Sequence, residues 1–219
     1  MNNPWNKIYK SGKQHSVYPW SNLVSLIKKN FKTNSNHVPI LEIGCGYGAN
    51  IQFLLDNGFD YYGVDISNFA IQKLKKKFPL LKEKLFALDF SKTKINSNIK
   101  FELIIDRGSG THCTTEQFKD FLEIYKDNFH KNIRYFALDW FSNKHSESKN
   151  SQKLDKNTRT NFKYGQFKDC GSVHFSTKNH IQNFLFKDWN CVYFVENLSI
   201  NRTKKNYKVG TFDFIMKKI

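Results

Sequence analysis

Apolar residues along the chain predict five buried strands with helical segments between them. Each strand is a short, mostly apolar run, which is typical of a sheet that is covered on both faces. The runs lie at residues 38–45, 61–67, 84–90, 101–109 and 133–141. Because strand and helix patterns alternate, we expect a mostly parallel sheet whose strands are joined by crossover helices.

Helical spacing and capping residues mark the connecting helices. Residues 49–58 predict a short helix that ends at Gly58. Ser67 can cap the helix that follows the second strand, and Thr114 with Gln117 forms a capping box for another helix. The inward face of that later helix is predicted to consist of Phe118, Phe121, Leu122, Tyr125 and Phe129.

The two ends of the chain and one long polar stretch fall outside this alternation. Residues 1–37 form a lead-in that is helical in pattern and rich in aromatic residues. After a predicted helix at 176–186, segments 190–202 and 210–218 predict an antiparallel pair of strands. Residues 142–175 contain a polar stretch without a period that is too long for an ordinary connection, so we expect a substrate-side loop or an insertion.

Composition is compatible with one domain over residues 1–219 that is built around a packed core. Hydrophobic residues make up 39% of the chain and aromatic residues 16%, which argues against disorder. No apolar run approaches the roughly 20 residues that span a bilayer, and the first residues contain no apolar signal core, so we expect a cytoplasmic protein. The four cysteines form no CxxC pair, so we expect reduced thiols and no metal site.

The formal net charge of +16 raises the question of a nucleic-acid partner. Only four of the 35 basic residues are arginine, and the lysines are scattered along the chain rather than gathered into one stripe. Arginine is the better fork for phosphate, so we attribute most of the charge to biased composition. A basic face would still attract a small phosphorylated substrate.

Three glycines, Gly44, Gly46 and Gly48, follow the first strand and predict a cofactor-binding turn. Glycine permits a tight backbone turn and lets a ligand approach without a clash against Cβ. Asp65 ends the second strand, 17 positions after Gly48, where an acid can accept hydrogen bonds from both ribose hydroxyls. Both NAD and S-adenosyl-L-methionine (SAM) are bound by turns of this kind.

Four details favour SAM over NAD. The glycines are spaced GxGxG rather than GxGxxG, and Glu42 would repel a pyrophosphate but suits the ammonium and sulfonium groups of SAM. Asp89 ends the third strand, where it can accept a hydrogen bond from the adenine amino group, and Phe90 can cover the ring. The chain also ends in a strand pair rather than in a further strand–helix repeat.

The segments LEIGCGYG, GVDIS, LDF and FELIIDRGS together resemble the successive motifs of class I SAM-dependent methyltransferases, over residues 38–140. The resemblance implies a Rossmann-like α/β fold with a seven-stranded, mostly parallel sheet whose last strand is antiparallel. It implies SAM as cofactor and S-adenosyl-L-homocysteine as product. It also assigns positions around SAM: Gly44, Cys45 and Gly46 at the methionine end, Glu42 at the turn or amino group, Asp65 at the ribose, Ile66, Asp89 and Phe90 at the adenine, and Asp106 beside the methyl group.

The lead-in WNKIYKSGKQHSVYPW resembles the W-x-x-x-Y-x-x-G…W opening of small-molecule methyltransferases of the thiopurine and tellurite type, and of those found with bacterial surface-polysaccharide genes. In such proteins this segment folds over the SAM pocket, which implies that Tyr9 contacts the cofactor. His15, Tyr18 and Trp20 are then either a lid over SAM and its substrate or the edge of a surface helix.

Asp106, Arg107 and His112 follow the fourth strand, at the edge where an open α/β sheet binds ligands. We expect His112 or Asp106 to act as a base and Arg107 to bind an anionic group of the substrate. In the alternative interpretation His112 caps the next helix, and Arg107 pairs with Asp106 or Glu42. No (D/N)PP(Y/F) motif follows this strand, which argues against amino targets such as adenine N6.

Two further pairs of residues are candidates for contact with the substrate. Trp140 ends the fifth strand, where it and Asp139 either touch the substrate or Trp140 packs in the core. His174 and Tyr164 flank the polar stretch and either enter the substrate pocket or stay outside it.

These features favour an O-methyltransferase that acts on a small, phosphate-bearing or nucleotide-linked metabolite, such as a precursor of a bacterial capsule or other surface polysaccharide. The alternative is an RNA methyltransferase, which the charge favours and the scattered lysines disfavour. The motif set argues against an NAD-dependent enzyme and against a non-catalytic protein of the same fold. A monomer and a homodimer are both compatible with the sequence.

Overall fold

A seven-stranded sheet forms the centre of the computed structural model, which describes residues 4–13, 15–31, 37–149, 151–204 and 206–219. Its strands, in the spatial order β3-β2-β1-β4-β5-β10-β9, are β1 (Val38–Ile43), β2 (Phe59–Asp65), β3 (Leu85–Ala87), β4 (Phe101–Arg107), β5 (Phe129–Phe141), β9 (Trp189–Asn201) and β10 (Tyr207–Lys218). Strands β1 to β5 are parallel, and β10 runs antiparallel between β5 and β9. The predicted α/β fold, with a mostly parallel sheet and an antiparallel last strand, is confirmed.

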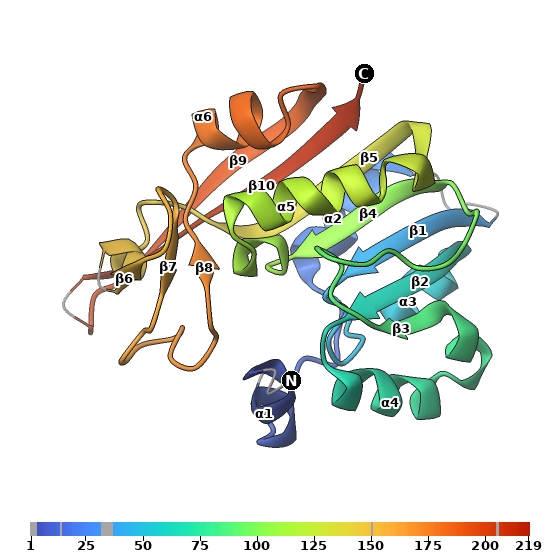
Figure 1. Cartoon of the computed structure of the whole chain (residues 1–219), viewed down its shortest axis with the longest axis horizontal. Helices are drawn as coiled ribbons and strands as arrows, with labels where there is room; N and C mark the ends of the chain where they lie inside the picture. The colour runs from blue at the N-terminus through green and yellow to red at the C-terminus, as the bar shows by residue number, and fades with distance from the viewer. Residues whose placement is uncertain (1–3, 14, 32–36, 150, 205) are drawn as a thin grey trace.

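Helices cover both faces of this sheet, as Figure 1 shows. They are α1 (Pro4–Lys10), α2 (Ser21–Asn30), α3 (Ile51–Asp56), α4 (Asn68–Lys77), α5 (Thr115–Ile124) and α6 (Lys178–His180), with 3₁₀ turns η1 (Pro79–Lys84), η2 (Gly110–His112), η3 (Lys126–Asn128) and η4 (Ser146–Lys149) and the π-helical turn η5 (Ile181–Leu185). Both predicted caps are confirmed: the Ser67 hydroxyl accepts the Ala70 N–H at 3.2 Å, and Thr114 and Gln117 form a capping box.

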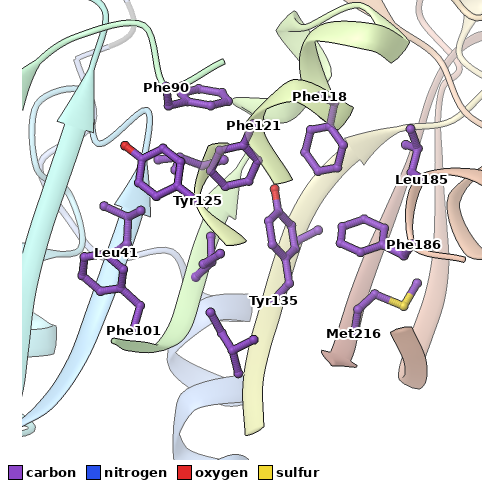
Figure 2. Close-up of a cluster of buried hydrophobic side chains, with 14 of the residues drawn as sticks. Leu41, Phe90, Phe101, Phe118, Phe121, Tyr125, Tyr135, Leu185, Phe186 and Met216 are labelled. Carbon is purple, nitrogen blue, oxygen red and sulfur yellow. The ribbon is translucent and has the colours of Figure 1, made fainter. Parts of the chain in front are cut away.

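Alternate residues of each central strand face opposite sides of the sheet, so the core has two layers. Leu41 and Ile43 of β1 face the layer of α5 and η5, where a dense aromatic cluster lies (Figure 2). Ile40 faces the layer of α2, α3 and α4. The aromatic cluster includes Phe118, Phe121, Tyr125, Tyr135 and Phe186, all less than 2% exposed.

The elements differ most from the predictions in three places. Strand β3 has three residues rather than seven. The predicted helix at 176–186 is one short α-turn followed by the π-helical turn η5. Phe129, predicted on the inner face of a helix, instead begins β5 and pairs with Phe101 of β4. Phe129 is a buried aromatic residue four positions after Tyr125, so it fits the helical spacing whether it continues the helix or begins the next strand. Periodicity alone therefore could not show where the helix ends.

Residues 142–175 form an insertion that contains a separate three-stranded antiparallel sheet. Its strands are β6 (Gln152–Lys153), β7 (Thr158–Thr160) and β8 (Val173–His174). A small apolar cluster of its own stabilises it, made of Phe162, Phe167, Val173 and Phe175 packed against Phe141 of β5. Figure 1 places this insertion and α1 beyond the end of the sheet toward which the arrowheads of β1, β2 and β4 point.

Some sequence predictions fall partly on residues outside the described ranges. These are residues 1–3, 14 and 32–36 of the lead-in and residue 150 of the insertion. In the part of the lead-in that is described, there are two helices, α1 and α2, and residues 11–13 and 15–20 between them are not helical. No helix within the described ranges is both long and apolar enough to cross a membrane.

Candidate functional site

A cavity of about 600 Å³ opens at the carboxyl ends of the parallel strands. One part of its wall is the glycine turn after β1 together with the ends of β2 and β3. Helix α1 and the link to α2 contribute Trp5, Tyr9 and Trp20 to the wall, and the insertion contributes Gln166, Phe167, Cys170 and Ser172. Ligands of open α/β sheets bind in this position, and the volume lies in the range of ligand-binding pockets.

The glycine turn and Asp65 are held together by backbone hydrogen bonds. Gly44 and Gly46 have positive φ angles of 64° and 53°, a conformation that favours glycine. The Asp65 carboxylate accepts the Gly46 N–H at 2.9 Å and the Ser67 N–H at 2.7 Å. Burial raises the pKa of Asp65 to about 6. The predicted ribose ligand therefore also fixes the shape of the turn.

Glu42 lies beneath the turn and lines the cavity, although it is only 3% exposed. Its two carboxylate oxygens accept hydrogen bonds from Asn50 Nδ2 at 2.7 Å and Tyr61 Oη at 2.6 Å. Burial raises the pKa of Glu42 to about 7. A cation bound in the cavity would favour the ionised carboxylate, so this acid suits a positively charged ligand.

The side of the cavity predicted to hold adenine contains Ile66, Asp89 and Phe90. Asp89 Oδ1 accepts hydrogen bonds from the N–H and hydroxyl of Ser91, at 3.1 and 2.6 Å. Its Oδ2 lies 3.3 Å from Lys92 Nζ. Phe90 packs edge-on against Phe121 of the core. Two apolar side chains beside one carboxylate are compatible with the polarity of a purine.

Helix α1 covers the glycine turn with aromatic side chains. Tyr9 is buried, and a Cβ atom at Gly46 would lie only 2.7 Å from the Tyr9 hydroxyl. The Tyr47 hydroxyl donates to the Tyr9 carbonyl at 3.0 Å, and the two rings meet edge to face. Cys45 lies in the turn beneath them and also lines the cavity. Tyr9 and Cys45 therefore both line the cavity at the glycine turn, and their contact with the cofactor stays a prediction.

Asp106 does not line the cavity, contrary to its predicted place beside the methyl group and its predicted role as a base. Its carboxylate is fully buried and accepts hydrogen bonds from the N–H groups of Ser109 and Gly110 at 2.8 to 3.1 Å. The Tyr135 hydroxyl donates a further hydrogen bond to it at 2.6 Å. The side chain points to the α5 face of the sheet, because β4 alternates its faces. Asp106 positions the loop after β4 instead.

Arg107 faces the cavity and is held on two sides. Its Nε donates to Asp139 Oδ2 at 2.8 Å, and its guanidinium lies 3.4 Å above the Trp20 ring. The partner is therefore Asp139, rather than Asp106 or Glu42. Asp139 has a φ of 52°, and its N–H donates to the buried Asp213 carboxylate at 2.8 Å. A non-glycine residue in this strained conformation at a cavity wall is typical of a functional site.

His112 lines the cavity, and the insertion fixes its orientation. Its Nδ1 lies 2.9 Å from the Ser172 carbonyl, while the Ser172 hydroxyl donates to the His112 carbonyl at 2.8 Å. Because a carbonyl only accepts, Nδ1 carries the proton and the lone pair of the neutral ring is on Nε2. Burial lowers the pKa of His112 to about 4, so the ring is neutral at neutral pH.

Four residues predicted to bind the substrate do not line the cavity. Tyr18 is 81% exposed, and His15 is exposed with its ring stacked on Tyr47. Trp140 is buried in the core, where its Nε1 donates to Ser176 Oγ at 3.0 Å. Contacts with neighbouring residues, such as Tyr47 and Ser176, determine where these side chains lie, and the sequence pattern did not predict those contacts.

His174 is the fourth of them, and it is buried inside the insertion. Its ring stacks on His180, and its Nδ1 lies 3.2 Å from Thr158 Oγ1. Tyr164 is exposed and also lies outside the cavity lining. Of the lid candidates, only Trp20 is placed against the cavity.

Sequence reasoning missed the wall that the insertion and β10 provide. Gln166, Phe167, Cys170, Val209 and Thr211 all line the cavity. They stand in segments without a motif, and the contacts that place them join residues far apart in sequence. In the described ranges, no group of three or more His, Cys, Asp or Glu side chains lies where it could hold a metal ion.

Comparisons with known proteins agree with this geometry. Residues 40–129 match the family model of a methyltransferase domain. A SAM-dependent methyltransferase from Methanosarcina mazei has a similar structure, with a TM-score of 0.69, 16% identity, and 94% of this chain and 99% of that chain covered. TehB from Haemophilus influenzae gives a TM-score of 0.64 at 16% identity, with 98% and 67% covered. At such identities the structural likeness establishes the fold.

One curated relative is similar over a short segment. The ribosomal RNA small subunit methyltransferase A of Parabacteroides distasonis is 42% identical over 55 residues, which is 25% of this chain and 21% of that protein. The match therefore spans about a fifth of the relative's length. The chain therefore contains a methyltransferase domain over residues 40–129 and has the fold of SAM-dependent methyltransferases, which supports S-adenosyl-L-methionine as its cofactor.

Proposed function

We propose that this protein transfers the methyl group of SAM to an oxygen atom of a small acceptor bound beneath the insertion. The single observation that supports this best is the placement of His112 in the cavity wall. SAM would occupy the part of the cavity between Phe90 and the glycine turn. The acceptor would then lie between the turn and the insertion, beside His112 and Arg107.

Methyl transfer is an in-line displacement at the sulfonium methyl, so the protein must position the nucleophile and take up its proton. His112 Nε2 suits this second task, because its lone pair is oriented by the Nδ1 bond to Ser172. No hydrogen bond from another described residue occupies that nitrogen. Since the pKa of His112 lies near 4, the base form is present throughout the neutral range, and kcat should stay flat between pH 6 and pH 8.

Arg107 would bind an anionic group of the acceptor. Asp139 accepts a hydrogen bond from Nε of the guanidinium, and Trp20 covers one face of the group. Among the described residues no hydrogen-bond partner occupies the two Nη groups, so they can donate to a ligand. Such a fixed planar fork suits carboxylate or phosphate. We therefore favour a phosphate-bearing or nucleotide-linked acceptor. The lead-in resemblance supports a precursor of a bacterial surface polysaccharide.

The test is a methyl-transfer assay with radiolabelled SAM against nucleotide sugars, phosphorylated sugars and thiols. We expect His112→Gln to lower kcat about 100-fold or more with an oxygen acceptor, because general base catalysis is removed. His130→Gln is the matched control, since His130 lies at the opposite, amino end of β5. Unchanged turnover in His112→Gln would exclude His112 from the mechanism, and exclusive labelling of thiols would contradict the oxygen target.

An RNA methyltransferase is the second candidate. The segment similarity to ribosomal RNA methyltransferases and the net charge of +16 favour it. RNA binding would weaken steeply with salt, because several lysines would displace counterions from phosphates. Labelling of ribosomal RNA, with a steep salt dependence and no labelling of the small acceptors, would favour this candidate over our proposal.

A further inference from the structure

The wall that the insertion contributes to the cavity contains a polar network behind Gln166. Gln166 lines the cavity, and a terminal atom of its side-chain amide lies 3.1 Å from His145 Nε2. His145 is buried, and its ring packs against Phe141, Phe167 and Phe175. Amide oxygen and nitrogen are assigned from their hydrogen-bond partners, so the partner chemistry of His145 decides which way this amide faces.

The position of the proton on His145 follows from its other nitrogen. The backbone N–H of Glu147 donates to His145 Nδ1 at 3.1 Å. A ring nitrogen that accepts a hydrogen bond carries no proton, so the neutral ring carries its proton on Nε2. Burial lowers the pKa of His145 to about 4, which keeps the ring neutral at neutral pH.

An Nε2–H group needs an acceptor, and the group beside it is the Gln166 amide. The amide oxygen must therefore face His145, which leaves the NH₂ group as the donor that the Gln166 side chain can offer at the cavity that this residue lines. We infer that Gln166 presents its amide NH₂ to the methyl acceptor and selects acceptors that carry a carbonyl, carboxylate or phosphate oxygen at that point. The inference rests on the proposed function, because it concerns the acceptor of that reaction.

The surroundings of Gln166 hold its backbone in place. The Gln166 N–H donates to Glu147 Oε1 at 3.1 Å, and the Tyr207 hydroxyl of β10 hydrogen-bonds to the same oxygen. Lys208 N donates to Ser146 Oγ at 2.8 Å, which ties η4 to β10 a second time. An NH₂ group fixed on such a wall discriminates well between substrates. A substrate that places its own N–H or O–H group at that point would leave both hydrogen-bond donors without a partner.

The first test measures the His145 tautomer directly, without any acceptor. Long-range ¹H–¹⁵N spectra of the labelled full-length protein distinguish protonated from unprotonated ring nitrogens, and His145→Phe identifies the signals of this ring. We expect the proton on Nε2 at pH 7. A proton on Nδ1 would turn the Gln166 amide round and overturn the inference.

The second test compares the kinetics of Gln166→Met and Gln166→Glu with those of wild type. It uses radiolabelled SAM and the compound that is methylated in the assay of nucleotide sugars, phosphorylated sugars and thiols. We expect kcat/KM for the acceptor to fall about tenfold in Gln166→Met, the size of one lost hydrogen bond, and further in Gln166→Glu. The change should lie in the KM of the acceptor and leave the KM of SAM unaltered. Gln72→Glu on the exposed face of α4 is the matched control.

Full activity in Gln166→Glu would overturn the inference, because a carboxylate can only accept hydrogen bonds. Activity lost equally in Gln72→Glu would assign the effect to overall charge and overturn it as well. A panel in which no small acceptor is methylated would contradict the proposed function instead. The His145 spectrum would then still support or overturn the orientation of the amide.

Discussion

Glu42 should make SAM binding depend on pH between 6 and 8. In the free protein burial raises the pKa of this carboxyl to about 7. The ammonium and sulfonium charges of SAM favour the ionised form, so the pKa falls in the complex and binding releases a proton. The affinity for SAM should therefore rise as the pH rises through 7.

The size of the effect follows from the fraction of ionised carboxyl. With a pKa near 7, about one carboxyl in eleven is ionised at pH 6 and about ten in eleven at pH 8, so Glu42 should weaken SAM binding about tenfold at pH 6 relative to pH 8. Asp65 has a pKa of about 6 and must be ionised to accept the ribose hydroxyls, which adds about a factor of two at pH 6. His112, with a pKa near 4, contributes nothing in this range.

Isothermal titration calorimetry of SAM at pH 6, 7 and 8 measures this dependence, and buffers of different ionisation enthalpy measure the proton release at pH 7. Glu42→Gln is the matched variant, because a glutamine can accept from Asn50 and donate to Tyr61 Oη in place of the carboxylate contacts. It should retain only the twofold change that Asp65 supplies. Equal pH dependence in both proteins, or no dependence in wild type, would refute the role of Glu42.

The same carboxyl should affect the stability of the free protein with a defined sign. Its pKa is higher in the folded protein than the ordinary value of 4.5, so the folded state binds the proton more tightly than the unfolded state. Raising the pH from 4.5 to 7 therefore removes roughly 3 kcal/mol of its contribution to the free energy of unfolding. Asp65, whose pKa is also raised, loses stability over this range in both proteins, so urea unfolding should show a loss that is roughly 3 kcal/mol larger in wild type than in Glu42→Gln. Losses of equal size in both proteins would contradict the assignment.

Two substitutions test the remaining structure of the site. Gly44→Ala should abolish measurable SAM binding, because its Cβ would overlap the Ser109 side chain, whereas Gly12→Ala, with a similar positive φ and open space around it, should retain SAM binding in calorimetry. Tyr135→Phe should lower the free energy of unfolding by about 1–3 kcal/mol in urea, since Asp106 Oδ2 loses a buried donor. An unchanged midpoint would show that the loop amides alone satisfy Asp106.

The cofactor side of the site was predictable because its contacts are local or follow from sheet topology. Gly46 and Asp65 stand at the ends of adjacent parallel strands, so the order of the strands brings them together. Asp89 lies two residues after the end of β3, at the same edge. The Ser67 cap and the Thr114–Gln117 box join residues three positions apart. Such contacts leave a pattern in the sequence that physical chemistry can interpret.

Asp106 shows where that reasoning failed. Its position at the end of β4 predicted a catalytic contact, but strand alternation turns its side chain toward α5. Its main side-chain donor, Tyr135, lies 29 positions away on β5. Trp140 failed for a related reason, because its partner Ser176 follows the whole insertion. A residue at the correct edge of a sheet can still face the core.

The part of the cavity where we propose that the acceptor binds depends on contacts between distant segments. Ser172 orients His112 across 60 positions, and Tyr207 holds Glu147 across another 60. In the sequence, residues 142–175 appear only as a polar stretch. Their structure depends on a few buried phenylalanines and on contacts with η2 and β10. Neither kind of contact leaves a periodic pattern of apolar residues in the sequence.

The glycine turn and the insertion form different parts of the cavity wall, and we expect the first to bind SAM and the second to bind the methyl acceptor. Asp65 is hydrogen-bonded to the glycine turn, and Glu42 lines the same cavity, so changes there should alter SAM affinity. The insertion meets His112 and the β10 strand, and it supplies Gln166 to the wall. Changes in the insertion should therefore alter the acceptor KM and kcat while SAM affinity stays constant. Acceptor specificity can then change by substitution within residues 142–175 without disturbing the sheet on which SAM binding depends.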